Sequence, residues 1–141
     1  MMTDEEIEAL ARAMIVCTLP KEAWTHAAHF AAALWMLRTR GEAATRAQMP
    51  DMIRRYNESV GGRNTETEGY RETITQASLT MASQALAAAK EAPLSEVLAT
   101  LLAGPCGQSG WVFAHWTKDR LFSPEARRAW APPDVAPLPA G

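Results

Sequence analysis

The segment from Trp24 to Arg40 restricts the fold of this chain more than any other, because as an α-helix it is apolar on two opposite sides. A helical projection, with about 100° between successive residues, separates two sets of side chains. One side carries His26, His29, Phe30, Ala33 and Leu37, and the other carries Ala28, Ala31, Ala32 and Trp35. A helix that is apolar on both sides must be covered on both sides. We therefore predict that it is either the central helix of a bundle or a helix at a subunit interface.

The rest of the chain repeats the pattern of amphipathic helices and lacks the period-two alternation that predicts a sheet. Further helices are predicted over residues 3–16, 42–60, 68–89, 96–103 and 111–121, with a last turn over 124–130. Thr3 and Glu6 have the spacing of a capping box at the start of the first predicted helix, and Thr65 and Glu68 have the same spacing at the start of the fourth. Pro50 predicts a kink or a restart within the third helix.

The length of 141 residues fits one domain. We predict an all-α fold, a single compact helical bundle of about five to six helices over residues 1–130. Residues 131–141 contain four prolines and predict an extended tail, which docks on the bundle or leaves it.

Composition excludes several classes of function. The net charge is only −2 and no dense basic run occurs, so nucleic acid and anionic membranes are not expected partners. Cys17 and Cys106 lie far apart without the spacing of a metal or disulfide motif. The acidic N-terminus is opposite in charge to a signal peptide, and no apolar run approaches the roughly 20 residues of a membrane span. We therefore expect a soluble, cytoplasmic protein.

His26 and His29 are the first candidates for chemistry, because residues three apart on a helix can point the same way. Such a pair could ligate a metal, or act as a base and its orienting partner. Glu72 is the natural partner of the two histidines. It falls on a mainly apolar stripe of its predicted helix, where a carboxylate is unusual unless it has a binding partner or a function. The plainer alternative is a hydrogen-bonded structural histidine and a carboxylate that favours the start of its helix.

Polar residues at both ends of the glycine-containing loop 61–67 extend this candidate pocket. Tyr56 and Asn57 precede the loop and Tyr70 follows it, although a core tyrosine with a satisfied hydroxyl is the plainer explanation for each phenol. The predicted binding set is Trp24, Tyr56, Asn57, Tyr70, Arg71 and Thr75. His115 lies among aromatic residues, where packing is favoured over lining a pocket.

Four sequence blocks resemble an uncharacterised family of small all-helical bacterial proteins. The blocks run from Trp24 to His29, from Tyr56 to Gly61, from Asn64 to Thr75 and from Leu121 to Arg127. The resemblance covers most of the chain and implies no settled activity. It implies a His-x-x-His motif on one helix and a His-Glu pair on another, which together look like a metal site.

Arg71 departs from the family pattern, which usually has histidine at this position. Arginine cannot ligate a metal and carries a fixed positive charge, so the departure favours either lost metal binding or an anionic ligand held by Arg71. The remaining His26, His29 and Glu72 could still hold zinc or iron with open positions, and a protein without any cofactor is equally compatible.

These features favour a small-molecule-binding protein, either an enzyme or a binding protein, with its pocket between the second and fourth helices. In an enzyme His26, His29 and Glu72 would supply acid/base or metal-assisted chemistry. The alternatives are a metal-binding protein or a non-catalytic interaction module. The module would form a homodimer through the Trp35 side of the second helix or the Leu79 and Leu86 side of the fourth.

Overall fold

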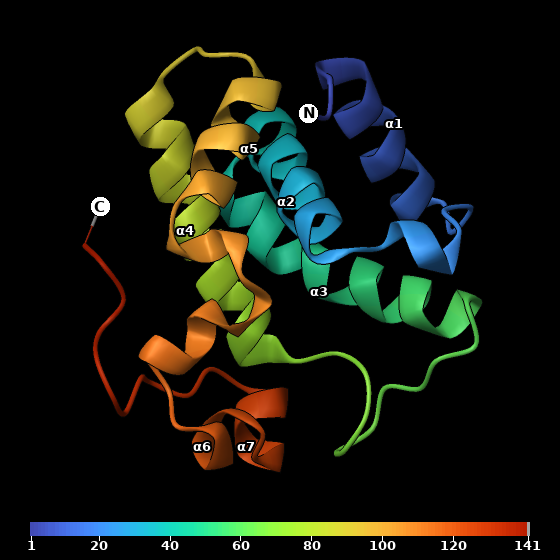
Figure 1. Cartoon of the computed structure of the whole chain (residues 1–141). Coiled ribbons are helices and arrows are strands. Elements are labelled where there is room, and N and C mark those ends of the chain that lie inside the picture. The colour runs from blue at the N-terminus through green and yellow to red at the C-terminus, as the bar shows by residue number, and fades with distance from the viewer. Residues whose placement is uncertain (141) are drawn as a thin grey trace.

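A computed structural model describes residues 1–140, and every regular element in that range is a helix (Figure 1). The α-helices are α1 (Asp4–Ile15), α2 (His26–Arg40), α3 (Glu42–Ser59), α4 (Glu72–Ala89), α5 (Leu94–Ala103), α6 (Lys118–Leu121) and α7 (Pro124–Arg128). Short 3-10 helices occupy η1 (Lys21–Ala23), η2 (Pro105–Gly107) and η3 (Ser109–Ala114). The prediction of an all-α bundle is confirmed. No helix within residues 1–140 combines the length and the apolar character needed to cross a bilayer.

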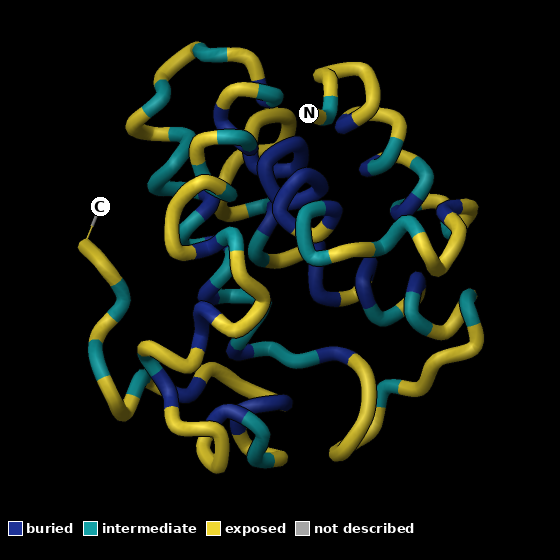
Figure 2. The backbone as a smooth tube through the Cα atoms, in the orientation of Figure 1, coloured by how far each residue is buried: buried dark blue, intermediate teal, exposed yellow. Residues whose placement is uncertain are grey.

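Helix α2 is the centre of the bundle. It contacts α1, α3, α4 and α5, and every residue from 30 to 37 is buried, as the dark helix in Figure 2 shows. Its Trp35 side is therefore covered by the chain's own helices, with Trp35 only 8% exposed. Of the two predicted positions for this helix, the structure has the central one, and the Trp35 side is not left free for a dimer.

The helix ends follow local sequence rules at α1 and α2. The Glu6 amide donates to Thr3 Oγ1 at 3.1 Å and the Thr3 amide donates to Glu6 Oε1 at 3.0 Å, so the predicted capping box is present. The Ala28 amide donates to Thr25 Oγ1 at the start of α2. Gly41, with φ of +83°, ends α2 where most residues would be strained.

Pro50 does not make α3 restart. The helix continues through it from Glu42 to Ser59, although proline removes one hydrogen bond of the helix interior. Pro50 is buried beside Met49 and Met52, which also face the core. Packing of this apolar stripe therefore outweighs the local cost of the proline.

The start of α4 was predicted four residues too early. Thr65 Oγ1 accepts from the Glu68 amide at 3.1 Å, as a cap would, but no helix follows. Gly69 has φ of +81°, which is incompatible with a continuing right-handed helix. Helix α4 therefore begins at Glu72, and residues 61–71 form one long loop at the end of the bundle (Figure 1).

The prediction of one amphipathic helix over 111–121 is wrong. The 3-10 helix η3 ends at Ala114, and α6 begins only after Thr117. Thr117 has an extended backbone, and its Oγ1 accepts from the Arg120 amide as an N-cap. Its own amide and hydroxyl both donate to Asp134, at 2.8 and 2.7 Å. Contacts with the tail therefore favour a helix start at this position.

The tail runs along the bundle. Trp116 Nε1 donates to the Ala131 carbonyl at 2.8 Å, the Val135 amide donates to the His115 carbonyl at 2.9 Å, and Gln84 Nε2 donates to the Pro139 carbonyl at 2.7 Å. Prolines lower the chain entropy that this docking costs. His115 is thus an anchor for the tail and not part of a pocket with His29.

Candidate functional site

His29 lies where two hollows of the surface meet. The outer hollow has a volume of about 500 Å³ and the inner hollow about 230 Å³. Both are lined by His29, Asn57 and Gly69, so they are two parts of one site between α2, α3 and the loop that leads into α4.

Most of the predicted site residues line these two hollows. The predicted residues present are Trp24, His29, Tyr56, Asn57, Tyr70, Arg71 and Thr75. The outer hollow adds Lys21, Val60, Gly62, Arg63 and Glu68, and the inner hollow adds Ile53 and Ile74. His26 and Glu72, which were predicted to act directly, line neither hollow. The combined space is of the size that small-molecule sites have.

The two histidines of α2 have separate roles. His26 Nε2 lies 2.7 Å from the Cys106 carbonyl oxygen, a hydrogen bond to η2 that takes its ring away from the site. His115 Nδ1 likewise bonds to tail carbonyls. His29 forms no side-chain hydrogen bond with residues 1–140, so its two ring nitrogens are free for a ligand or water. The predicted His26–His29 pair is corrected to a single candidate histidine.

The surroundings of His29 keep its imidazole neutral. His29 is exposed to solvent at the open side of the hollows, although many protein atoms surround its ring. Desolvation by this protein lowers the pKa of His29 below its usual 6.5, and the neighbouring His26 lowers it further. Solvent contact opposes part of the desolvation without changing the direction of the shift. At pH 7 the ring can therefore accept a hydrogen bond or a proton.

Trp24 and Tyr56 form the aromatic side of the outer hollow. The Trp24 ring stacks on His29, with centroids 4.0 Å apart and planes at 28°. Tyr56 lies 5.4 Å from Trp24 between centroids, and its hydroxyl donates to the Leu19 carbonyl at 3.0 Å. That hydroxyl is engaged with the segment before η1, so Tyr56 contributes a wall to the hollow and no free donor.

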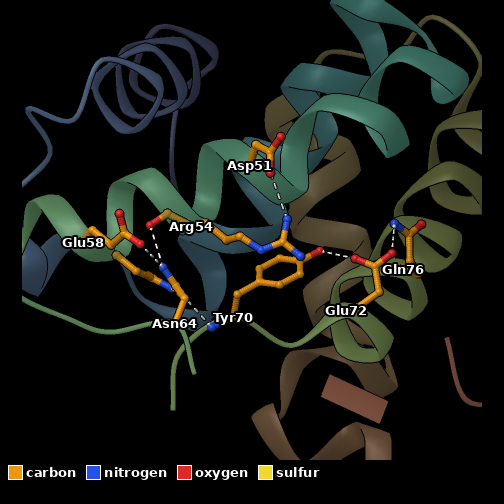
Figure 3. A network of polar contacts seen from close by, with 8 residues as sticks. Asp51, Arg54, Glu58, Asn64, Tyr70, Glu72 and Gln76 are labelled. Atoms are coloured by element: carbon orange, nitrogen blue, oxygen red, sulfur yellow. Dashed lines mark hydrogen bonds and ion pairs between the residues drawn. The ribbon is translucent and has the colours of Figure 1, made fainter. Parts of the chain in front are cut away.

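Glu72 acts on the site through Tyr70. The Tyr70 hydroxyl donates to Glu72 Oε1 at 2.6 Å, and Gln76 Nε2 donates to Glu72 Oε2 at 3.2 Å (Figure 3). Burial raises the pKa of Tyr70, and the hydrogen bond to Glu72 raises it further. The phenol is therefore protonated at pH 7, and Glu72 fixes its direction. The Arg54 guanidinium, 4.3 Å from the ring centroid, covers the phenol ring.

Asn64 organises the loop and was not among the predicted site residues. Its Oδ1 accepts from the Tyr70 amide at 3.1 Å and from Asn57 Nδ2 at 3.3 Å, and its Nδ2 donates to the Arg54 carbonyl at 3.0 Å. A loop asparagine that bonds to backbone is a common device. Its place in the glycine-containing loop, two residues after Gly62, does not identify these partners.

Arg71 is a part-buried cation without an acidic partner. The ion pairs within residues 1–140 join Arg12, Arg46, Arg54 and Arg128 to carboxylates, and Arg71 belongs to none of them. Its guanidinium carbon lies 4.4 Å from the centroid of Phe122, and its Nε is buried without an acceptor. Burial lowers the pKa of Arg71, and the nearby charge of Arg127 lowers it further.

The metal site predicted from His26, His29 and Glu72 is not assembled. Residues 1–140 contain no group of three or more His, Cys, Asp or Glu side chains that could hold a metal ion. The reason is geometric: His26 bonds to η2, Glu72 bonds to Tyr70, and only His29 faces the hollows.

A third hollow of about 540 Å³ lies between α4 and α5, but it suits the predicted chemistry less well. Its walls are mainly alanine and aliphatic side chains, including Met81, Val97 and Leu101, and its one charged residue is Glu96. No histidine or arginine reaches it. The hollows beside His29 are therefore the better candidate for a site.

Comparisons of the chain with protein-family models, with curated proteins and with solved structures found no match. The family resemblance drawn from the four sequence blocks thus stays a prediction.

Proposed function

We propose that this protein binds a small organic anion in the paired hollows beside His29. The observation that carries the proposal is the combination of two residues in the lining of one hollow: within residues 1–140, His29 has no side-chain hydrogen bond and Arg71 has no acidic partner. A free neutral imidazole and an uncompensated cation match a ligand that carries a carboxylate and a proton donor.

The charge of Arg71 is the reason to prefer an anion. A guanidinium that is partly desolvated, close to a second arginine and without a carboxylate lowers the stability of the empty protein. A bound carboxylate would offset that cost. The start of α4 favours the same ligand. The side chain of its N-cap residue, Arg71, forms no hydrogen bond with the backbone amides of the first turn, and the positive end of a helix dipole attracts anions.

The remaining walls fit a ligand with an apolar or planar body. Trp24, Tyr56 and Val60 line the outer hollow, whereas Asn57 and Thr75 offer polar side chains at its junction and in the inner hollow. The ligand would thus place its charged end inward and its body against the aromatic side. If the protein is an enzyme, neutral His29 is its general base, and Tyr70, whose single hydroxyl proton is donated to Glu72, offers the ligand its oxygen as an acceptor.

Benzoate and its neutral isostere benzamide provide a direct test. We expect benzoate to shift the NMR signals of the His29 ring and the Trp24 indole in a saturable way, and benzamide to bind at least tenfold more weakly. Arg71→Met should abolish the preference for benzoate. Arg55→Met is the matched control, because Arg55 is an exposed arginine of α3 outside both hollows. Equal binding of the two probes, or no shift of either signal, would contradict the proposal.

A further inference from the structure

Arg127 of α7 reaches the loop that walls the site, although the two segments lie almost 60 residues apart in the chain. Its Nη1 donates to the Gly69 carbonyl at 2.9 Å and to the Tyr70 carbonyl at 3.5 Å, and its Nη2 donates to the Thr67 carbonyl at 3.3 Å. Arg127 is only 6% exposed. A buried guanidinium that donates to three carbonyls of one loop positions that loop specifically, because its planar fork of donors has a fixed geometry.

The segment held by Arg127 is the wall shared by the two hollows. Glu68 and Gly69 line the outer hollow, and Gly69 and Tyr70 line the inner one. On its other side this wall touches the rest of the loop closely, since a Cβ at Gly69 would collide with the Arg63 carbonyl and with Asn64 Oδ1. The wall is therefore held from within by Asn64 and from outside by Arg127.

The charge of Arg127 also connects α7 to the site. The charge of Arg127 lowers the pKa of the Arg71 guanidinium, and neither arginine forms an ion pair within residues 1–140. The Nε atoms of both are buried without acceptors. The positive charge of the arginine that holds the wall thus disfavours the charge of the arginine that lines the site. An anion beside Arg71 would weaken that effect.

We propose that Arg127 is a positioning residue for the site: it holds the Thr67–Tyr70 wall in place, and occupancy of the hollow by an anion stabilises this arrangement in return. The second half rests on the proposed function, whereas the first does not. Thermodynamic linkage makes this coupling reciprocal: the factor by which a bound anion stabilises the Arg127 contacts equals the factor by which those contacts strengthen binding of the anion.

Arg127→Met, compared with Arg128→Met, tests the positioning role by amide hydrogen exchange. Arg128 is the neighbouring arginine, is exposed, and makes one long contact of 3.5 Å to Glu66. We expect Arg127→Met to speed exchange of the Tyr70 amide and of the loop amides around it at least tenfold, while the α2 core amides keep their protection. Arg128→Met should leave the loop unchanged. Arg127→Lys should restore part of the protection, because an ammonium still donates to carbonyls.

Benzoate binding separates this inference from the proposed function. In the wild type, benzoate should slow exchange in the loop and in α7 together, and its Kd should rise at least fivefold in Arg127→Met. If benzoate does not bind but Arg127→Met loosens the loop, the proposed function fails and the positioning role stands. If the loop of Arg127→Met exchanges as in the wild type, the positioning role is wrong. If Arg127→Met does not fold, loop exchange in Arg127→Lys tests the positioning role, and exchange as slow as in the wild type would contradict it. Loop exchange in the wild type with and without benzoate then tests the effect of the anion.

Discussion

Trp24 stacks on His29 at a centroid distance of 4.0 Å, and within residues 1–140 no side-chain hydrogen bond holds the candidate imidazole. A ring held by an aromatic face keeps both nitrogens available, whereas a ring held by a hydrogen bond gives one of them up. The position of Trp24 is itself fixed, since it follows η1 and lies against Tyr56, whose hydroxyl bonds to the Leu19 carbonyl. The outer hollow therefore has a rigid aromatic side.

Separate roles for the two α2 histidines predict different effects of substitution. His26→Ala should lower the free energy of unfolding by about 1–3 kcal/mol, because it leaves the Cys106 carbonyl without its partner. His29→Ala should cost less than about 1.5 kcal/mol, chiefly the stacking with Trp24, and should abolish the NMR response to benzoate. Urea unfolding of both variants measures the first quantity. A larger loss of stability in His29→Ala than in His26→Ala would contradict this division.

The lowered pKa of His29 predicts a pH dependence of stability with a definite sign. In the unfolded chain the ring takes up a proton near pH 6.5, whereas in the folded protein it does so only at lower pH. Below pH 6.5 the unfolded state therefore binds more protons, and the free energy of unfolding falls as the pH is lowered until the folded ring is protonated too. Above pH 6.5 this contribution is constant.

An NMR titration of the His29 ring carbon-bound proton measures the shift directly, and urea midpoints between pH 7.5 and 4.5 measure its effect on stability. His29→Gln should remove that part of the pH dependence, because glutamine does not titrate. A His29 ring that titrates at or above 6.5 would show that the hollow does not disfavour the charged form.

Gly69 and Gly41 form a matched pair for the geometry of the loop. Both have positive φ, of +81° and +83°, so alanine at either position is strained by about 1–3 kcal/mol. A Cβ at Gly41 meets open space, whereas one at Gly69 collides with the Arg63 backbone. Gly69→Ala should therefore destabilise the protein more than Gly41→Ala and should also impair benzoate binding. Equal losses of stability, with binding unchanged in both, would mean that the loop adjusts at no cost to the site.

The sequence predicts the frame of the site because that frame depends on local rules. Apolar residues on both sides of α2 require its central position, and Thr3, Thr25 and Gly41 mark helix ends through their own hydrogen bonds or backbone freedom. Residues that flank a loop between two packed helices must meet at one end of a bundle, which explains why Asn57 and Tyr70 lie together.

The role of His26, the support of the site wall and the start of α6 depend on contacts between distant segments. His26 lies one helical turn from His29, but its Nε2 forms a hydrogen bond with the Cys106 carbonyl of η2, 80 residues later in the chain. The wall of the site is held by Arg127, about 60 residues downstream, and α6 begins where Asp134 meets Thr117. Nothing in the local pattern of a single sequence reports which distant backbone group a buried polar side chain will find.

Thr73 and Thr45 are two buried threonines whose hydrogen-bond partners the sequence does not predict. Comparing them tests how much a hydrogen bond to a distant segment contributes to stability. Both are fully buried threonines on helices that pack together. Thr73 Oγ1 donates to the Ala129 carbonyl and accepts from the Ala131 amide, each at 3.0 Å, whereas Thr45 Oγ1 has no partner. Valine has nearly the same shape as threonine, so each substitution removes the hydroxyl and little else.

Thr73→Val should thus lower the free energy of unfolding by about 2 kcal/mol or more, because two backbone groups of the segment after α7 lose their partner. Thr45→Val should leave it unchanged or raise it by up to about 1 kcal/mol, because an unsatisfied buried hydroxyl is replaced by a methyl group. Urea unfolding compares them directly. Thr73→Val should also loosen the segment that follows α7, visible as faster exchange of the Ala131 amide. Similar stabilities for the two variants would mean that the Thr73 bridge does not hold this segment to α4.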